Sequence, residues 1–253
     1  MNLMRPIPGS APRAMGLAAA SALDVDLVAR LLEHLPDAPF FVKDRALTYV
    51  SANQAMAKLC GVRDATALIG KTAADFFPTA DTSYFEALDR IALNGKAVND
   101  QLRLCRSFEG APGWLLFSKQ PVTDSNGAVI GVAAIARSLP APSRKHPTYA
   151  RLSAAMEFIN ANIGRQIRVS DLARRANISV SQFERDFAAL FGVSPNRYIT
   201  NARLEAAFAM LQSGGDIADI AQACGYCDQS AFTRRFRQTI GASPSEFRRL
   251  MRV

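Results

Sequence analysis

The chain has 253 residues, which is long enough for two domains. Its net charge of +8 and pI near 9.7 favour a polyanionic partner such as nucleic acid. No stretch approaches the ~20 apolar residues of a membrane span, and two histidines in the whole chain leave little for general acid–base catalysis. We therefore expect neither a membrane protein nor an enzyme.

The first 22 residues are rich in Ala, Pro and Gly, and prolines together with Arg13 interrupt any apolar run. We predict a disordered tail there rather than a signal peptide, followed by a first domain over residues 23–138. This region opens with an apolar stripe on a short helix: Leu27, Val28, Leu31, Leu32 and Leu35. The stripe could form a dimer contact or pack against its own domain, and helical spacing alone does not choose between the two.

The sequence of this first domain predicts two strands, then helices, then three strands. The strands are expected at Phe40–Val42, Leu47–Val50, 98–106, 113–122 and 128–137, with helices near 53–60 and 82–94. The turn at Asp124–Gly127 joins the last two strands, and its Asn-Gly pair predicts positive φ angles.

This order resembles a PAS sensor domain over about residues 30 to 138. The matching positions are Asp44, Asn53, Leu68–Thr72, Asp75–Pro78, Trp114, Asp124, Gly127 and Gly131. The resemblance implies an α+β domain: a five-stranded antiparallel sheet with helices on one face and a cavity between them. It also implies dimerisation through the segment before the first strand.

The candidate cavity residues are apolar or aromatic: Tyr49, Phe76, Phe77, Leu88, Leu104 and Trp114. They can equally form a filled core. No cofactor is predicted, because neither histidine lies where it could hold haem and Cys60 is outside the flavin motif of this fold. An effector, if bound, is expected to be small and apolar or aromatic. The alternative is a protein-interaction module without a ligand.

A linker is predicted at residues 139–148, because Ala141–Pro147 carries two prolines and no apolar period. From residue 149 to 253 the chain has 14 arginines against nine acidic residues, and no lysine follows Lys145. The planar, bidentate guanidinium suits phosphate and guanine better than an ammonium group does. The charge pattern therefore favours nucleic-acid binding by this part.

Residues 149–253 contain an internal repeat at an offset of 49 residues. The offset carries Phe183–Phe187 onto Phe232–Phe236, and Gly192–Pro195 onto Gly241–Pro244. Two copies are too few for a solenoid, so they indicate a duplicated supersecondary unit.

Each copy reads as two helices joined by a tight turn, over about 170–190 and 217–239. Ser170 is the predicted N-cap of the first copy's first helix. Asn177 and Gly225 end the first helices, because both tolerate a left-handed backbone. The second helices are expected to begin at Ser179, with a capping box to Gln182, and at Asp228.

The phenylalanines of each second helix recur four residues apart and predict a buried face. The opposite, polar faces carry Ser181, Glu184 and Arg185 in the first copy, and Gln229, Ser230, Thr233 and Arg234 in the second. Arg and Gln can make bidentate contacts with guanine and adenine edges in the major groove. The small Ser181 and the acidic Glu184 predict weaker base contacts from the first copy.

A continuous helix is predicted from Pro195 to Gln212, between the Ser-Pro start and the Ser213–Gly215 stop. At 1.5 Å per residue it would be about 27 Å long. Successive major-groove faces are about 34–36 Å apart. Such a helix could therefore hold both reading helices against one side of a duplex.

Residues from about 149 to 253 resemble the DNA-binding domain of AraC/XylS-type transcription regulators. The resemblance rests on Ile217–Ala221, Gly225-Tyr226, Asp228–Phe232, Phe236-Arg237 and Gly241–Arg248. It implies an all-α domain of seven helices with two helix-turn-helix motifs, and sequence-specific binding to double-stranded promoter DNA. It assigns the base contacts to the polar faces given above. Backbone contacts are expected from Arg197, Arg235, Arg237 and Arg248. RNA polymerase and a second copy of the chain are the further partners that it implies.

An enzyme linked to DNA-alkylation repair is the rival interpretation, and it would need a metal-binding cysteine cluster. The N-terminal half offers only Cys60 and Cys105. Cys224 and Cys227 form a C-x-x-C without the further ligands that zinc requires, so we expect a structural or incidental role. Sparse cysteines without a disulfide framework favour the reducing cytoplasm.

Overall fold

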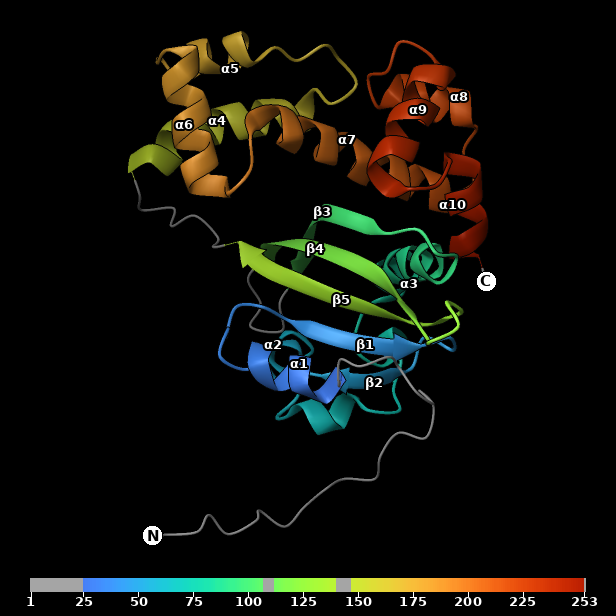
Figure 1. Cartoon of the computed structure of the whole chain (residues 1–253). Helices are drawn as coiled ribbons and strands as arrows, with labels where there is room; N and C mark the ends of the chain where they lie inside the picture. Colours follow the sequence, from blue (N-terminus) through green and yellow to red (C-terminus); the bar gives the residue numbers. More distant parts are fainter. Residues whose placement is uncertain (1–24, 107–111, 140–146, 253) are drawn as a thin grey trace, which may run out of the picture.

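The computed structural model describes residues 25–106, 112–139 and 147–252, as a sheet domain beneath a helical domain (Figure 1). The predicted tail at residues 1–22 lies outside the described residues, as does most of the predicted linker at 139–148. Within the described ranges, no helix is long and apolar enough to cross a membrane.

The sheet domain is built on the expected five-stranded antiparallel sheet, in the order β2-β1-β5-β4-β3. Its strands are β1 (Phe40–Asp44), β2 (Tyr49–Ala52), β3 (Val98–Arg106), β4 (Pro112–Thr123) and β5 (Val129–Leu139). Because side chains alternate along a strand, Phe40 and Val42 pack under helix α1 (Val25–Leu32), whereas Phe41 and Lys43 point to the opposite face.

The opposite face of the sheet is covered by the helices between β2 and β3. They are α2 (Gln54–Leu59), the 3-10 turns η1 (Ala65–Leu68) and η2 (Ala73–Asp75), and α3 (Thr79–Leu93). Asn53 caps α2 by accepting from the Met56 amide, and its side chain also accepts from the Phe40 amide at 2.9 Å. This buried asparagine therefore ties the start of α2 to β1.

The turn between β4 and β5 forms at the predicted residues but with a different backbone. Gly127 has the expected positive φ of 81°, whereas Asn126 does not. The Asp124 side chain accepts from the amides of Asn126 and Ala128, each at 2.9 Å. The aspartate thus stabilises a turn that needs only one left-handed residue, and the prediction for Asn126 is wrong.

Seven helices form the helical domain within the described residues, as the resemblance implied. They are α4 (Pro147–Ala161), α5 (Val169–Arg175), α6 (Val180–Phe191), α7 (Pro195–Gln212), α8 (Ile217–Ala223), α9 (Gln229–Ile240) and α10 (Pro244–Met251). The 18-residue α7 is the predicted connecting helix and begins at the Ser194 cap. It joins a first half (α4–α6) to a second half (α8–α10).

One predicted cap in the first half is wrong and a second is only half formed. The Arg168 carbonyl accepts the first bonds of α5, so Ser170 lies inside the helix rather than at its N-cap. Ser179 caps α6 as expected, by accepting from the Gln182 amide. The Gln182 side chain, however, donates to Asp186 at 2.5 Å instead of completing a capping box.

The tight turns inside both halves have the predicted left-handed residues, with φ of 55° at Asn177 and 75° at Gly225. At Gly225 space matters as well, because a Cβ there would lie 2.5 Å from the Ile163 carbonyl oxygen. Asp228 caps α9 as predicted, and Ser243 with Glu246 forms a capping box at the start of α10.

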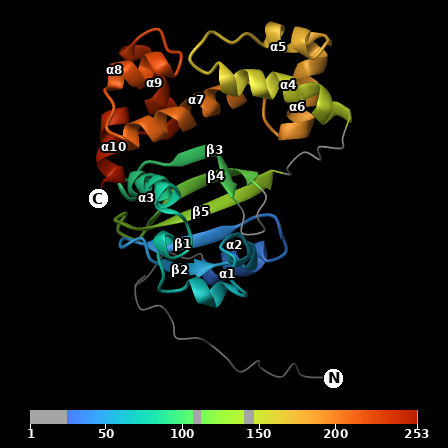
Figure 2. The ribbon, with the colours of Figure 1, turned by 180° about the vertical axis from the view of Figure 1, so that it is seen from behind.

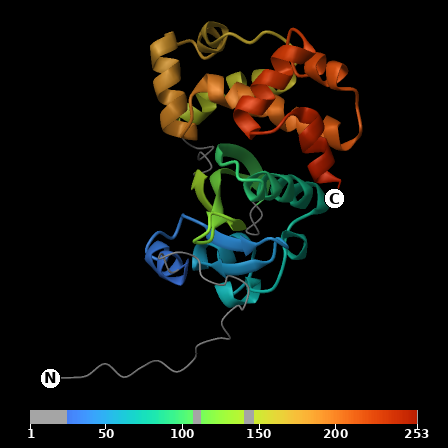
Figure 3. The same cartoon turned by 45° about the vertical axis from the view of Figure 1, so that its right-hand side comes forward.

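The two domains share buried apolar contacts. The helical domain lies over β3 and α3 (Figures 1 and 2), and α10 lies beside α3 (Figure 3). One buried cluster, called here the interdomain core, contains residues of both domains: Tyr84, Leu88 and Ile91 of α3, Leu115 and Phe117 of β4, and Phe208, Phe236 and Phe247 of the second half and α7. The core of the first half is separate and receives Leu102 of β3.

Candidate DNA-reading surface and sensor cavity

Helix α9 carries the predicted polar face of the second copy on the outside of the helical domain. Phe232 and Phe236 are fully buried beneath it, with ring centroids 5.5 Å apart. A shallow depression on the exposed side is lined by Gln229, Ser230, Thr233, Arg234, Arg237 and Gln238. The helix therefore presents several hydrogen-bond donors from a rigid aromatic base, the arrangement that base reading requires.

Helix α6 presents the first copy's face in the same manner. Ser181, Glu184 and Arg185 are exposed, while Phe183 and Phe187 are fully buried. The polar face of α6 therefore offers one cation beside one carboxylate. The structure brings the predicted residues of each copy onto one helix face, and their contacts with DNA stay a prediction.

The four arginines expected on the DNA backbone lie in different surroundings. Arg237 is exposed beside the reading face of α9, and Arg235 donates to the Thr200 hydroxyl at 3.5 Å. Arg197 donates to the Asp100 carbonyl of β3 at 2.5 Å, and Arg248 donates to the Gly215 carbonyl. In this arrangement Arg197 and Arg248 are engaged with the protein, and their phosphate contacts stay a prediction.

Cys224 and Cys227 differ in environment although they are close in sequence. Cys224 is buried, which raises the pKa of its thiol to about 11, whereas Cys227 is exposed. Within the described ranges, no group of three or more His, Cys, Asp or Glu residues could hold a metal ion.

A small cavity lies between the sheet and its covering helices, with a volume of about 40 Å³. Of the predicted pocket residues, Tyr49 and Phe77 line it. Phe76 packs edge-on against Tyr49 with centroids 6.2 Å apart, and Leu88 belongs to the interdomain core. The side chains of Leu104 and Trp114 lie outside the described residues.

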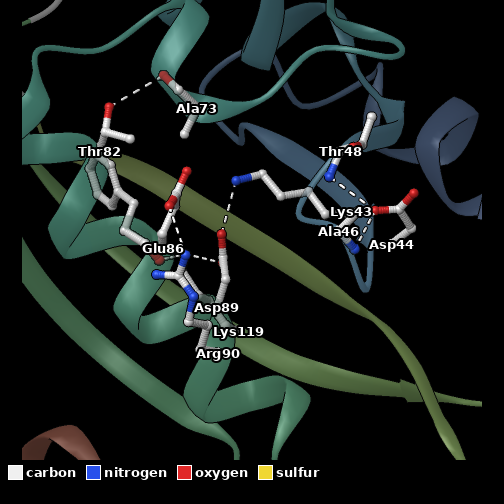
Figure 4. A network of polar contacts seen from close by, with 11 residues as sticks. Lys43, Asp44, Ala46, Thr48, Ala73, Thr82, Glu86, Asp89, Arg90 and Lys119 are labelled. Carbon is white, nitrogen blue, oxygen red and sulfur yellow. Dashed lines mark hydrogen bonds and ion pairs between the residues drawn. The ribbon is translucent and has the colours of Figure 1, made fainter. Parts of the chain in front are cut away.

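The charged residues at one end of this cavity were not predicted from the sequence. Lys43 and Lys119 line it and both pair with Asp89 of α3 (Figure 4). The side chains are 1%, 2% and 0% exposed, respectively. We call these three residues the lysine–aspartate triad. Asp89 comes 46 residues after Lys43 and 30 residues before Lys119. No local sequence motif could therefore contain all three residues.

Burial and mutual charge shift the titration of the triad and its neighbours. Burial alone would raise the pKa of Asp89, but the two ammonium groups lower it. Burial lowers the pKa of Lys119 to about 8 despite the opposing effect of Asp89. Burial also raises the pKa of Tyr49 well above its ordinary value and that of Cys60 to about 12. Tyr49 and Cys60 are thus uncharged at neutral pH.

A second polar cluster lies between the domains. Arg103 of β3 donates to Asp81 of α3 at 2.6 Å and to Glu205 of α7 at 3.1 Å. Its guanidinium carbon lies 4.0 Å from the ring centre of Tyr84. The Tyr84 ring is in turn 4.6 Å from that of Phe208 in α7. One arginine and one tyrosine of the sheet domain therefore connect it to the helix that joins the two halves.

Comparison with known families separates the chain into the same two parts. Residues 172–250 match the model of a helix-turn-helix domain, of the AraC type, and residues 32–142 match that of the PAS fold. These bounds contain both reading helices in the first case and the whole described sheet in the second.

Individual relatives match over a limited length. The probable transcriptional regulator LumQ of Photobacterium leiognathi is 29% identical over 96 residues, 38% of this chain and 39% of its own. A putative AraC-like transcription regulator of Streptomyces lividans is 31% identical over 99 residues, 39% of this chain and 33% of its own. The alignments thus span well under half of these relatives. The solved DNA-binding domain of AdpA, in complex with a target DNA, is 28% identical, covering 40% of this chain and 93% of that domain at a TM-score of 0.38.

Proposed function

Residues 172–250 belong to the AraC-type helix-turn-helix family and residues 32–142 to the PAS fold, and on that premise we propose that the protein is a sequence-specific regulator of transcription. Double-stranded promoter DNA is its partner, and α6 and α9 enter two major grooves. RNA polymerase, which regulators of this type contact, is the second partner. The sheet domain controls the binding.

The observation that carries this proposal is the pair of matching amphipathic helices. Both bury two phenylalanines at the same spacing and expose polar side chains on the opposite face. If these polar faces were only exposed to solvent, there would be no reason for the same pattern of polar and buried residues to recur 49 residues later, on the second helix of the second motif. The net charge of +8 supports a polyanionic partner.

The sheet domain is in a position to influence both halves. Leu115 and Phe117 line the sensor cavity and also belong to the interdomain core with Phe208 and Phe236. Leu102 reaches the core of the first half. A change in the volume of the cavity therefore acts on a wall that packs against the DNA-reading domain. Packed cores respond to such changes by discrete shifts.

Helix α1 supplies a surface for a second copy of the chain. Val28 and Leu32 pack against the sheet, whereas Leu27, Leu31 and Leu35 are 42%, 60% and 52% exposed. Part of the predicted stripe therefore packs inward against the sheet, and the other part is exposed. We assign the outward side to a homodimer, because paired reading units increase affinity on repeated sites.

The proposal is tested by fluorescence anisotropy on a duplex chosen by in vitro selection with the full-length protein. Arg234→Ala should weaken binding to the selected site by about 1–3 kcal/mol and relax its sequence preference. Arg252→Ala, at the exposed end of α10, is the matched control and should leave the preference unchanged. Unaltered affinity and preference in Arg234→Ala would reject α9 as a reading helix.

A further inference from the structure

The sensor cavity contains more positive than negative charge. Lys43 and Lys119 share the single carboxylate of Asp89, and all three side chains are buried. Glu86 is nearby on α3, but it pairs with Arg90 at 3.2 Å. Tyr49 and Cys60, which also surround the triad, have raised pKa values and are neutral. The closed space between sheet and helices therefore holds about one uncompensated positive charge.

The donors of the two lysines are only partly used. Each ammonium group has three N–H bonds. Lys43 Nζ donates to Asp89 Oδ2 at 2.9 Å, and Lys119 Nζ donates to Asp89 Oδ1 and, at 3.0 Å, to the Phe85 carbonyl. Three acceptors among the described residues thus serve six N–H bonds. A buried cation without a full set of partners is costly unless an anion joins it.

The walls beside the lysines are aromatic. Lys43 Nζ lies 4.6 Å from the ring centre of Tyr49, and Lys119 Nζ lies 5.7 Å from that of Phe85 and 5.8 Å from that of Phe117. Phe41 and Phe77 also line the cavity. Ring faces stabilise the cations and also form a flat apolar site. The combination suits a planar molecule with a negatively charged end.

We propose that the cavity binds a small aromatic monoanion, whose charged oxygen accepts hydrogen bonds from Lys43 and Lys119 while its ring packs among the phenylalanines. This assignment deepens the proposed function, on which it rests, by giving the chemical class of the signal. It also adds a negative charge to the small apolar or aromatic effector that the sequence led us to expect, because the triad was not foreseen.

The ligand must enlarge the cavity when it binds. A volume of about 40 Å³ has room for little more than one water molecule, which occupies about 30 Å³ in the liquid. Phe77 lies in the segment between η2 and α3, and its half-buried ring can move outward without disturbing a strand. Phe117 packs against Phe85 at 5.8 Å and against Tyr84 at 6.4 Å, and the Tyr84 ring in turn touches the helical domain. Enlargement on that side would reach the DNA-reading domain.

The test uses the full-length protein at pH 7 and two probes of equal shape, benzoate and its neutral amide, benzamide. Thermal unfolding is followed at increasing concentrations of each. Benzoate should raise the unfolding temperature more than benzamide, because only a charged ligand binds the lysines tightly. Lys119→Met should reduce the benzoate affinity about ten- to hundredfold and leave the benzamide affinity unchanged. Lys96→Met, an exposed lysine at the end of α3, is the matched control and should behave as wild type.

Equal shifts with both probes, or benzoate binding that survives in both Lys119→Met and Lys43→Met, would overturn the proposal. No shift with either probe up to about 10 mM would do so as well, since a charge-assisted site should hold a small anion at that concentration. Each sample is also assayed for DNA binding by anisotropy. If the wild-type protein does not bind DNA, the proposed function is rejected. If it binds DNA but does not discriminate between benzoate and benzamide, only the anion site is rejected.

Discussion

The two halves of the helical domain have the same pattern of helices but are attached differently to the sheet domain. The second half contributes Phe236 and Phe247 to the interdomain core, where they meet Tyr84 and Ile91 of α3. The first half has its own core and receives little more than Leu102 from β3. Of the two copies of the motif, the second half is therefore packed firmly against the sheet domain, and the first half is attached to it by fewer contacts.

This difference indicates where a signal can act. In the proposed function the reading helices engage adjacent grooves at the same time, so their affinity for DNA depends on how the halves are placed relative to each other. A sensor packed firmly against one half can change that placement by moving its own wall. The polar faces differ in the same sense: α9 offers Gln229 and Arg234, whereas α6 offers Arg185 beside Glu184. The half nearer the sensor is therefore also the better equipped to read bases.

The largest expected effect comes from emptying the core of each half in turn. Phe236→Ala and Phe187→Ala both remove a fully buried ring and should lower the free energy of unfolding by about 3–5 kcal/mol. Only Phe236→Ala should also increase hydrogen exchange in α3, because its ring belongs to the interdomain core. Exchange measured by mass spectrometry on both variants is the check. Equal exchange in α3 would contradict the proposed difference in attachment.

A smaller loss of stability is expected from Arg103→Leu, which removes the cation between Asp81 and Glu205. Asp81 and Glu205 then lose the hydrogen-bond donor that they share, which should cost about 2–3 kcal/mol. Arg103→Lys is the conservative control and should recover part of the loss, because one ammonium group cannot serve both acceptors with the geometry of a guanidinium. Chemical denaturation gives the free energies. A stability of Arg103→Leu equal to wild type would show that Arg103 does not hold the domains together.

A smaller difference between the halves is expected in the binding free energy that each loses when its base-reading arginine is removed. Arg234→Ala is expected near the upper end of the range of about 1–3 kcal/mol for a lost base contact, and Arg185→Ala near the lower end. The reason is that Glu184 lies on the same exposed face as Arg185 and disfavours close approach to phosphates. Anisotropy on one selected duplex compares the two variants directly. A larger loss for Arg185→Ala would assign the main contacts to the first half.

Sequence reasoning succeeded where the controlling interactions are local. The Asp228 cap and the left-handed positions Asn177 and Gly225 depend on neighbours within a few residues, and the structure has them as predicted. The same holds for the order of strands and helices along the sheet domain, whose turns are marked by Gly and Asp. The predicted Ser170 cap is wrong because the helix begins two residues earlier, at Arg168, whose carbonyl accepts the first bonds without any side-chain cap.

The misses concern residues that meet only through the tertiary fold. Lys43, Asp89 and Lys119 come from β1, α3 and β4, and each alone reads as an ordinary charged surface residue. Leu88 was expected in the cavity, yet α3 has two buried sides and turns Leu88 toward the interdomain core. When two sides of a helix are buried, the hydrophobic periodicity of its sequence does not show which side packs against which neighbouring element.

The smallest expected effect is a pH dependence that arises at the contact between Arg103 and Glu205. Burial raises the pKa of Glu205 to about 7, with Asp81 adding to the effect and Arg103 opposing it. In the unfolded chain the group titrates near 4.5, so the folded protein holds the proton more firmly. The stabilisation from this group is complete below pH 4.5 and is lost as the pH rises through 7.

Glu205→Gln should remove this part of the pH dependence, because the amide cannot ionise but can still accept from Arg103. The variant should therefore be more stable than wild type at pH 8 and nearly equal to it at pH 5. Glu157→Gln on the exposed side of α4 is the control and should change neither value. Denaturation curves at both pH values provide the comparison. If Glu205→Gln is less stable than wild type at pH 8, the ionised carboxylate is the form that holds α7 to the sheet domain, and the contact is a conventional ion pair.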